Sequence, residues 1–214
     1  MQLADFEAPP TPPPIYGPVR QIAYIVPNID DAIAFWQSQN VGPFLVTRQV
    51  SPFSNSYYRG TKTGGITIDI AFSYVGDMQL ELIAPVNDVP SPYQEMIQRR
   101  DQGVHHYAVW VKNFSEAYRY ATSQPDNTVV MDTGIDGIAR MSYIENSTTK
   151  ITLEVIEWNA MTAVYFQNIE KRLSAIAQRE TVEEFHLGEL TPKLVLLPVL
   201  AKFAINKLLG RLKR

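Results

Sequence analysis

The sequence predicts an α+β fold built from two βαβββ modules and completed by a helical C-terminal extension. One observation is an internal repeat, since residues 21–35 (QIAYIVPNIDDAIAF) align without a gap with residues 106–120 (HYAVWVKNFSEAYRY). The other is a matching pair further along, LELI at residues 80–83 and LEVI at residues 153–156. Segments that recur in a fixed order mark a repeated structural unit. The chain therefore contains one supersecondary unit twice.

The first module begins with residues 19–26, which are apolar and β-branched enough for a strand. Asn28 is a typical N-cap residue, with Asp31 at the third position of the following helix. The Val-Gly-Pro sequence at 41–43 ends this helix, and the polar, aromatic residues 51–65 are expected to form a loop. The predicted elements are a helix at 29–39 and strands at 19–26, 44–50, 66–74 and 78–83.

The second module repeats this order. Asn113 is the expected N-cap of its helix, with Glu116 in the position of a capping box. Asn146-Ser147 is the expected turn between its last two strands. The predicted elements are a strand at 104–111, a helix at 114–123 and strands at 128–132, 137–145 and 150–157.

The two ends of the chain differ from the repeated part. Residues 1–18 include six prolines and are expected to form an extended arm. Residues 160–179 carry an apolar stripe typical of a helix. We therefore divide the chain into an arm at 1–18, a domain at 19–158 with modules 19–85 and 103–158, and an extension at 159–214.

The last residues of the extension are basic and amphipathic, because no acidic residue follows Glu189. Two interpretations of residues 193–214 stay open. They could contact a membrane surface or a partner, or they could pack on the domain or on a second subunit. We favour packing, since surface helices are usually amphipathic because one face covers a core.

Composition excludes several classes of function. The chain has 214 residues, of which 45% are hydrophobic and 19% charged, so it can bury a core. A net charge of −3 gives no reason to expect a nucleic-acid partner. The absence of cysteine excludes disulfides, thiolate metal sites and a cysteine nucleophile. Without a signal peptide or an apolar run of about 20 residues, a cytoplasmic location is the expectation.

Strand parity places four polar residues on one face. Gln21 and His106 alternate with the bulkier residues that should pack on the helices, and Glu81 and Glu154 likewise alternate with leucine and valine. Each could be an ordinary edge or surface residue by itself. Because corresponding positions of both repeats carry them between apolar neighbours, a shared metal site is the favoured interpretation. His105, by the same parity, is expected on the helix side or the surface.

At these residues the chain resembles the vicinal oxygen chelate (VOC) superfamily, which includes glyoxalase I, methylmalonyl-CoA epimerase, extradiol dioxygenases and bleomycin-resistance proteins. The resemblance covers roughly residues 17–158 and rests on the openings QIAYIVPNIDDAIAFW and HHYAVWVKNFSEAY and the endings LELIAP and LEVIEW. It implies a cup-shaped mixed sheet with a divalent metal in the cup. The implied ligands are Gln21, Glu81, His106 and Glu154.

The type of ligand narrows the chemistry. One amide, two carboxylates and one imidazole suit Zn, Ni, Co, Mn or Mg. Gln21 stands where the dioxygenases of the superfamily have a histidine, which argues against oxygen activation. The set is similar to that of some glyoxalase I enzymes and close to that of the epimerases. The resemblance thus implies a lyase, isomerase or epimerase that removes a proton next to a carbonyl and stabilises an enediolate on the metal. Glu154 is the candidate base, and Glu81 is the alternative.

The expected partner is a small-molecule substrate. Tyr57, Tyr58 and Arg59 in the 51–65 loop could contact it, as could Trp110 on the cavity face. The resemblance also implies a homodimer. The alternative function is that of a non-catalytic, resistance-type protein that binds a small molecule in a hydrophobic cup. In a third interpretation the cup is vestigial and the basic tail makes the chain a peripheral membrane or scaffold protein.

Overall fold

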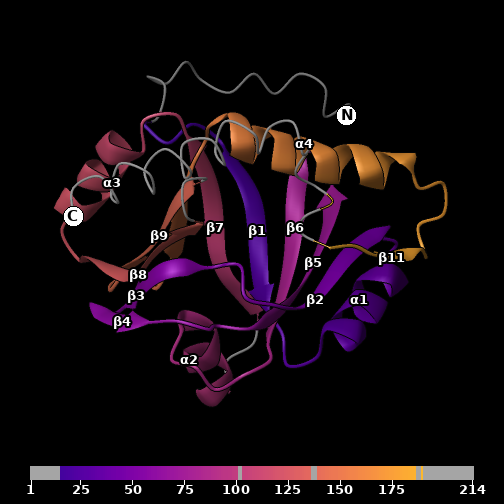
Figure 1. Cartoon of the computed structure of the whole chain (residues 1–214), viewed down its shortest axis with the longest axis horizontal. Coiled ribbons are helices and arrows are strands. Elements are labelled where there is room, and N and C mark those ends of the chain that lie inside the picture. The colour runs from indigo at the N-terminus through magenta and orange to yellow at the C-terminus, as the bar shows by residue number, and fades with distance from the viewer. Residues whose placement is uncertain (1–14, 101–102, 136–138, 187–188, 190–214) are drawn as a thin grey trace, which may run out of the picture.

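The computed structural model describes residues 15–100, 103–135, 139–186 and 189 (Figure 1). This part of the chain forms one mixed eleven-stranded sheet with four α-helices. The strand order is β11-β2-β5-β6-β1-β7-β10-β9-β8-β3-β4. The predicted α+β class and the repeated βαβββ order are both confirmed.

The first module occupies one side of the sheet. Its elements are β1 (Val19–Ile25), α1 (Ile29–Ser38), β2 (Phe44–Val50), β5 (Ile68–Val75) and β6 (Met78–Pro85). Asn28 caps α1, because its side-chain oxygen accepts hydrogen bonds from the backbone N–H groups of Asp30 and Asp31. Ile33 of α1 packs with Leu80 and Leu82 of β6 on the outer face of the sheet.

The second module repeats the arrangement on the other side. Its elements are β7 (Gly103–Val111), α3 (Phe114–Ser123), β8 (Asn127–Ile135), β9 (Ala139–Asn146) and β10 (Thr152–Glu157). Phe114 and Ala117 of α3 pack with Val109 and Val155 on the outer face. The first strands of the modules, β1 and β7, pair antiparallel and join the two halves. Both helices therefore cover the bulkier side of their strands, as the parity predicts.

Residues 51–65 are not the loop that their polarity suggested. They contain β3 (Ser54–Tyr58) and β4 (Thr61–Thr63), a hairpin that turns at Arg59 and Gly60, both with positive φ. β3 pairs antiparallel with β8, so a segment of the first module extends the sheet of the second. Main-chain hydrogen bonds stabilise a strand whatever its side chains are, and here the buried hydroxyls of Ser56 and Thr133 also lie 2.7 Å apart.

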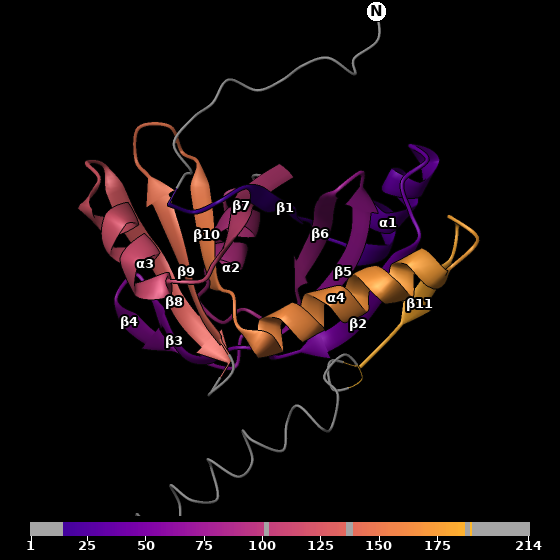
Figure 2. The same cartoon turned by 90° about the horizontal axis from the view of Figure 1, so that it is seen from above.

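The extension begins with a helix that covers the inner face of the sheet. α4 (Ala160–Ala175) crosses the open side of the curved sheet, close to β2 and β5 (Figure 2). Its N-terminus carries a capping box between Asn159 and Thr162. Phe166, Ile169 and Leu173 belong to the same buried cluster as Phe72 of β5. The helix ends at Ala175, four residues before the expected end at 179, because Ile176 has an extended backbone.

Aromatic stacking holds the start of α4. The ring of Phe166 lies 4.4 Å from the ring of Trp110 on β7, and Trp110 stacks on Trp158 with 4.8 Å between the centroids. These three rings are nearly parallel, at interplanar angles of 3° and 23°. Burial of such large rings stabilises the packing of α4 on the sheet.

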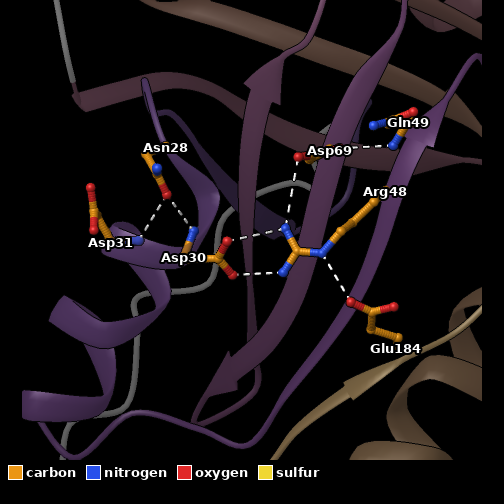
Figure 3. A network of polar contacts seen from close by, with 7 residues as sticks. All are labelled: Asn28, Asp30, Asp31, Arg48, Gln49, Asp69 and Glu184. Carbon is orange, nitrogen blue, oxygen red and sulfur yellow. Dashed lines mark hydrogen bonds and ion pairs between the residues drawn. The ribbon is translucent and has the colours of Figure 1, made fainter.

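Besides β3 and β4, two more short elements were not expected from the sequence. α2 (Pro92–Gln98) contacts β6 and β1, and β11 (Val182–Glu184) pairs parallel with β2 at the edge of the sheet. Arg48 of β2 binds three acidic side chains there, Asp30 of α1, Asp69 of β5 and Glu184 of β11 (Figure 3). One guanidinium thereby links the added edge strand to the module.

The terminal segments were assigned only from the sequence. Residues 1–14 of the proline-rich arm and residues 190–214, with the basic tail at 193–214, lie outside the described residues. No helix among the described residues is long and apolar enough to span a membrane.

Candidate functional site

The four candidate ligands lie on the four neighbouring strands at the centre of the sheet. β6, β1, β7 and β10 carry Glu81, Gln21, His106 and Glu154, respectively. Ala23 pairs with Glu81 on one side and with His106 on the other. Ala108 likewise pairs with both Gln21 and Glu154. The two alanines stand between the larger side chains and leave room for them on the inner face.

The four side chains are buried, and three of them meet. His106 Nε2 lies 3.1 Å from Glu154 Oε2 and 3.5 Å from Glu81 Oε2. The exposed fractions are 0% for His106, 3% for Glu154, 7% for Glu81 and 1% for Gln21. Two carboxylates away from water are costly unless a positive charge accompanies them. An imidazolium offsets one negative charge, and a divalent cation would offset both.

Gln21 is oriented by a second glutamine. Its Nε2 donates to Gln79 Oε1 at 2.9 Å, and Gln79 Nε2 donates in turn to the hydroxyl of Tyr74 at 3.1 Å. This chain of amides leaves Gln21 Oε1 buried with no hydrogen-bond partner. A buried acceptor without a partner is rare and points to a missing ligand. Gln79 has the same parity as Glu81, so strand alternation in the sequence could have identified it.

His105 agrees only in part with the expectation from parity, because it is half-buried and lines a groove with Arg99 and Lys150 but also contacts His106. β7 has a bulge opposite β1, because Ala23 pairs with His106 while Tyr24 pairs with Val104. The extra residue breaks the alternation, and His105 Nδ1 lies 2.8 Å from His106 Nδ1. The His105 ring also contacts the rings of Tyr93 and Tyr143. It therefore also belongs to the site.

The two tyrosines complete the polar wall of the site. The hydroxyls of Tyr93, from α2, and Tyr143, from β9, lie 2.9 Å apart. Burial and the nearby Glu154 carboxylate raise the pKa of both phenols well above the ordinary value, so both stay protonated. Neither was expected from the sequence, because α2 was not predicted and a tyrosine in a strand is usually an ordinary core residue.

Burial and charge act in opposite directions on the pKa of His106. Desolvation alone would lower this pKa, but the carboxylates of Glu154 and Glu81 outweigh it and raise the pKa to about 9. Burial raises the pKa of Glu81, with His106 opposing the change. For His105, burial and the neighbouring His106 lower the pKa well below 6.5. His105 is thus the neutral and His106 the charged imidazole of the pair in the protein without a metal.

The residues fit a divalent metal by their chemistry, although the side chains do not yet surround one. No group of three or more His, Cys, Asp or Glu side chains in the described part of the chain is arranged as a metal site, although His106 contacts both carboxylates. His106 Nε2 nevertheless has no well-formed hydrogen bond, and neither does Gln21 Oε1. Amide, carboxylate and imidazole donors suit Zn and harder divalent ions. Metal binding would replace the contacts between imidazole and carboxylate.

A cavity opens beside this set. It has a volume of about 340 Å³ and lies between the inner face of the sheet and α4. Gln21, Glu81 and Glu154 line one part of it. The other lining side chains are mainly apolar: Pro52, Phe53, Ile68, Ile70, Phe72, Ile83, Ile135, Ala139, Met141, Ile156, Met161 and Phe166, with Tyr93, Tyr143, Thr162 and Tyr165. A small molecule there would have its polar end at the candidate ligands.

The four residues suggested for substrate contact do not line this cavity. Tyr57 is 46% exposed and lines a groove on the outer surface beside α3. The Tyr58 hydroxyl and the Arg59 guanidinium both bind Glu95 of α2. Trp110 lies on the inner face as expected, but Trp158 and Phe166 cover its ring.

A model of the glyoxalase/bleomycin resistance protein/dioxygenase superfamily matches residues 20–135. No curated protein sequence matches the chain significantly. A solved hypothetical protein from Bacillus halodurans C-125 is 20% identical, with a TM-score of 0.47 over 66% of this chain and 94% of its own. Methylmalonyl-CoA epimerase from Mycobacterium tuberculosis is 16% identical, with a TM-score of 0.48 over 70% and 93% of the chains.

Proposed function

Because the chain belongs to the glyoxalase/bleomycin resistance protein/dioxygenase superfamily, we propose that it is a metal-dependent enzyme that removes a proton next to a carbonyl group. Members of this superfamily typically use divalent metals and act on small molecules. The reaction would be that of a lyase, isomerase or epimerase. Gln21, Glu81, His106 and Glu154 would hold the ion.

One observation carries this proposal. Four buried polar side chains stand on four adjacent strands, and three of them, Gln21, Glu81 and Glu154, line a cavity whose other side chains are mainly apolar. Core positions of a sheet rarely carry carboxylates, and a pair of them is costly without a counter-ion. Such groups collect where charge has to be bound or protons moved. The proposal accounts for all four residues together.

Each residue has a role that its contacts support. Gln21 would bind through the free Oε1, since Gln79 holds the other end of its amide. His106 would bind through Nε2, because its Nδ1 faces His105. A bound divalent cation would supply Lewis-acid stabilisation of negative charge on a carbonyl oxygen. Glu154 lines the cavity and is our candidate to take the proton, with Glu81 as the alternative.

The first test is elemental analysis of the purified, tag-free protein. We expect one divalent metal per chain in the wild type, lost in Glu81→Ala and retained in Glu157→Ala. Glu157 is a suitable control because its carboxylate binds Arg140 at the end of β10 and does not line the cavity. A wild-type protein that binds no metal, even after reconstitution, would contradict the proposal.

A second test follows proton abstraction without knowledge of the product. Compounds with a hydrogen next to one of two neighbouring oxygen-bearing carbons are incubated in D₂O, and deuterium uptake is followed by NMR. We expect exchange with the wild type, and Glu154→Gln to reduce its rate by about 10²-fold or more. Exchange at the wild-type rate in Glu154→Gln would remove this residue from the proposed role.

A non-catalytic binding protein is the second candidate. Direct contact of His106 with both carboxylates provides charge compensation without a metal, and the cavity would still bind an apolar compound. Ligand binding that chelators leave unchanged, together with the absence of metal and of deuterium exchange, would favour this function.

Members of the superfamily often form dimers, and we propose a homodimer here as well. Light scattering coupled to size-exclusion chromatography tests this directly. A mass that stays near the 24.2 kDa of one chain would contradict it.

A further inference from the structure

The cavity beside the candidate ligands is lined by two kinds of side chain. The buried carboxylates Glu81 and Glu154 line one part of it, and the rest is mainly hydrocarbon and aromatic surface. We propose that this cavity accepts an uncharged, mainly apolar molecule and rejects anionic ones. The inference rests on the proposed function, because the same molecule would present its carbonyl oxygens to the ion that the four candidate ligands would hold.

The charges of the lining side chains disfavour an anionic ligand. Among the described residues that line the cavity there is no lysine and no arginine. An anion among the apolar side chains would leave water without a cationic partner in the lining, which is costly, and the buried His106 imidazolium is already paired with Glu154 and Glu81. Substrates that carry phosphates or several carboxylates need such partners. A metal ion at the ligand end would not help a charge carried at the far end of the molecule.

The walls of the cavity are mainly apolar and enclose a small volume. Ile68, Ile70 and Phe72 of β5 form one side, and Met161, Tyr165 and Phe166 of α4 form the other. The volume of about 340 Å³ is near the lower limit of roughly 300–1,000 Å³ that is usual for small-molecule pockets. A compound the size of a substituted single ring fits this space, and burial of its apolar area would supply most of the affinity.

α4 lines the cavity although it belongs to neither repeat. Its start is fixed by the capping box at Asn159 and by the stack of Phe166 on Trp110. Ile169 and Leu173 anchor the next turns in the core. α4 thus supplies a firmly placed apolar wall that would select which substrates enter the cup.

A matched pair of probes tests the inference. Methyl phenyl diketone with a para carboxylate and the methyl ester of that acid share two vicinal oxygens and differ in charge at the far end. We expect isothermal titration calorimetry on the wild type to give a Kd at least tenfold lower for the ester. Equal or tighter binding of the acid overturns the inference, and so does the failure of both probes to bind at millimolar concentration.

Substitutions at Met161 test whether the cavity wall causes the preference for the ester over the acid. Met161→Lys places a cation in the wall, and we expect it to bring the Kd of the acid to or below that of the ester. Met161→Leu keeps the volume and should keep the preference for the ester. An unchanged preference in Met161→Lys would assign the selectivity to another part of the molecule and overturn the inference.

A second measurement decides the question if Met161→Lys does not fold. In protein with ¹³C-labelled methionine methyl groups, the ester should shift the Met161 signal, which Met161→Leu identifies by its disappearance. The signal of Met131, which is buried but does not line the cavity, should stay in place. A shift of Met131 without one of Met161 would overturn the inference.

Failure of the cavity inference can be distinguished from failure of the proposed enzymatic function. Titrations are made on the protein as purified and again after removal of metal with EDTA. A preference for the ester without metal and without deuterium exchange would support the cavity inference while the enzymatic function fails. Metal bound by the four ligands, with equal affinity for acid and ester, would overturn the inference and leave the function standing.

Discussion

His105 and His106 are consecutive residues of one strand, yet their Nδ1 atoms lie 2.8 Å apart. The bulge in β7 brings both rings to the same region. Since one nitrogen must donate and the other accept, His105 fixes which nitrogen of His106 is free to face Glu154 and Glu81. The pair therefore sets the geometry of the candidate metal site through a residue that would not bind the metal.

Loss of the His105 imidazole should weaken metal binding without unfolding the protein. We expect His105→Phe to raise the Kd for the metal by about 10- to 100-fold, as removal of a group that orients a ligand typically does. Tyr107→Phe, in the same strand, is the control and should leave the Kd unchanged. Equal metal affinity in the wild type and His105→Phe would show that His106 needs no orienting partner.

The stability of the metal-free protein should fall as the pH rises from 6.5 to about 9. The carboxylates of Glu154 and Glu81 raise the pKa of His106 to about 9, above its ordinary value of 6.5. A raised pKa means stabilisation that is complete below the pKa of the unfolded chain and is lost as the pH passes the folded value. The loss is at most about 3 kcal/mol.

Urea unfolding of the chelated protein at several pH values in this range measures the effect. Glu154→Gln removes one of the two carboxylates and should make the dependence on pH shallower. A free energy of unfolding that is flat or rises with pH in the wild type would contradict a charged His106 in the metal-free protein.

The aromatic stack under α4 should be a major source of stability. Phe166→Ala deletes a side chain that is 8% exposed and stacked on Trp110. We expect the free energy of unfolding to fall by about 3–5 kcal/mol. Phe35→Ala is the matched control, because this ring is 57% exposed, and its cost should stay below about 1 kcal/mol. Similar losses in both variants would show that α4 is only loosely attached.

The ion pairs of Arg48 should contribute modestly and in a salt-dependent way. Arg48→Ala removes contacts to Asp30, Asp69 and Glu184, and we expect a cost of about 1 kcal/mol that shrinks at high salt. The exposed Arg20 is the control, with an expected change near zero for Arg20→Ala. A cost for Arg48→Ala that is independent of salt would assign the effect to packing of the side chain.

The sequence predicted what depends on local periodicity. The repeat and the alternation within each strand placed Gln21, Glu81, His106 and Glu154 on the inner face, and the structure has them there. Element boundaries agree within a few residues, and the helix at 114–123 agrees at both ends. These features follow from the chain alone, because the side-chain alternation of a strand and the caps of a helix are local properties.

What the sequence did not predict depends on contacts between distant segments. The bulge at His105 exists only relative to β1, and parity cannot foresee it. The β3–β4 hairpin is defined by its pairing with β8, although its polar sequence favoured a loop. The apolar stripe of α4 was visible, but not that it would pack inside the cup and form a wall of the cavity. Tyr93 and Tyr143 joined the site for the same reason.

The pairing of β3 with β8 limits how the two modules can be separated. A repeated unit can in principle be reduced to a single copy. Here, however, the β3–β4 hairpin of the first module pairs through β3 with β8, at the edge of the second module. Residues 19–85 expressed alone would keep the hairpin without the strand it pairs with, and residues 103–158 would expose β8 as a bare edge open to aggregation. The two halves depend on each other through this pairing, so neither should fold as well alone as in the whole chain.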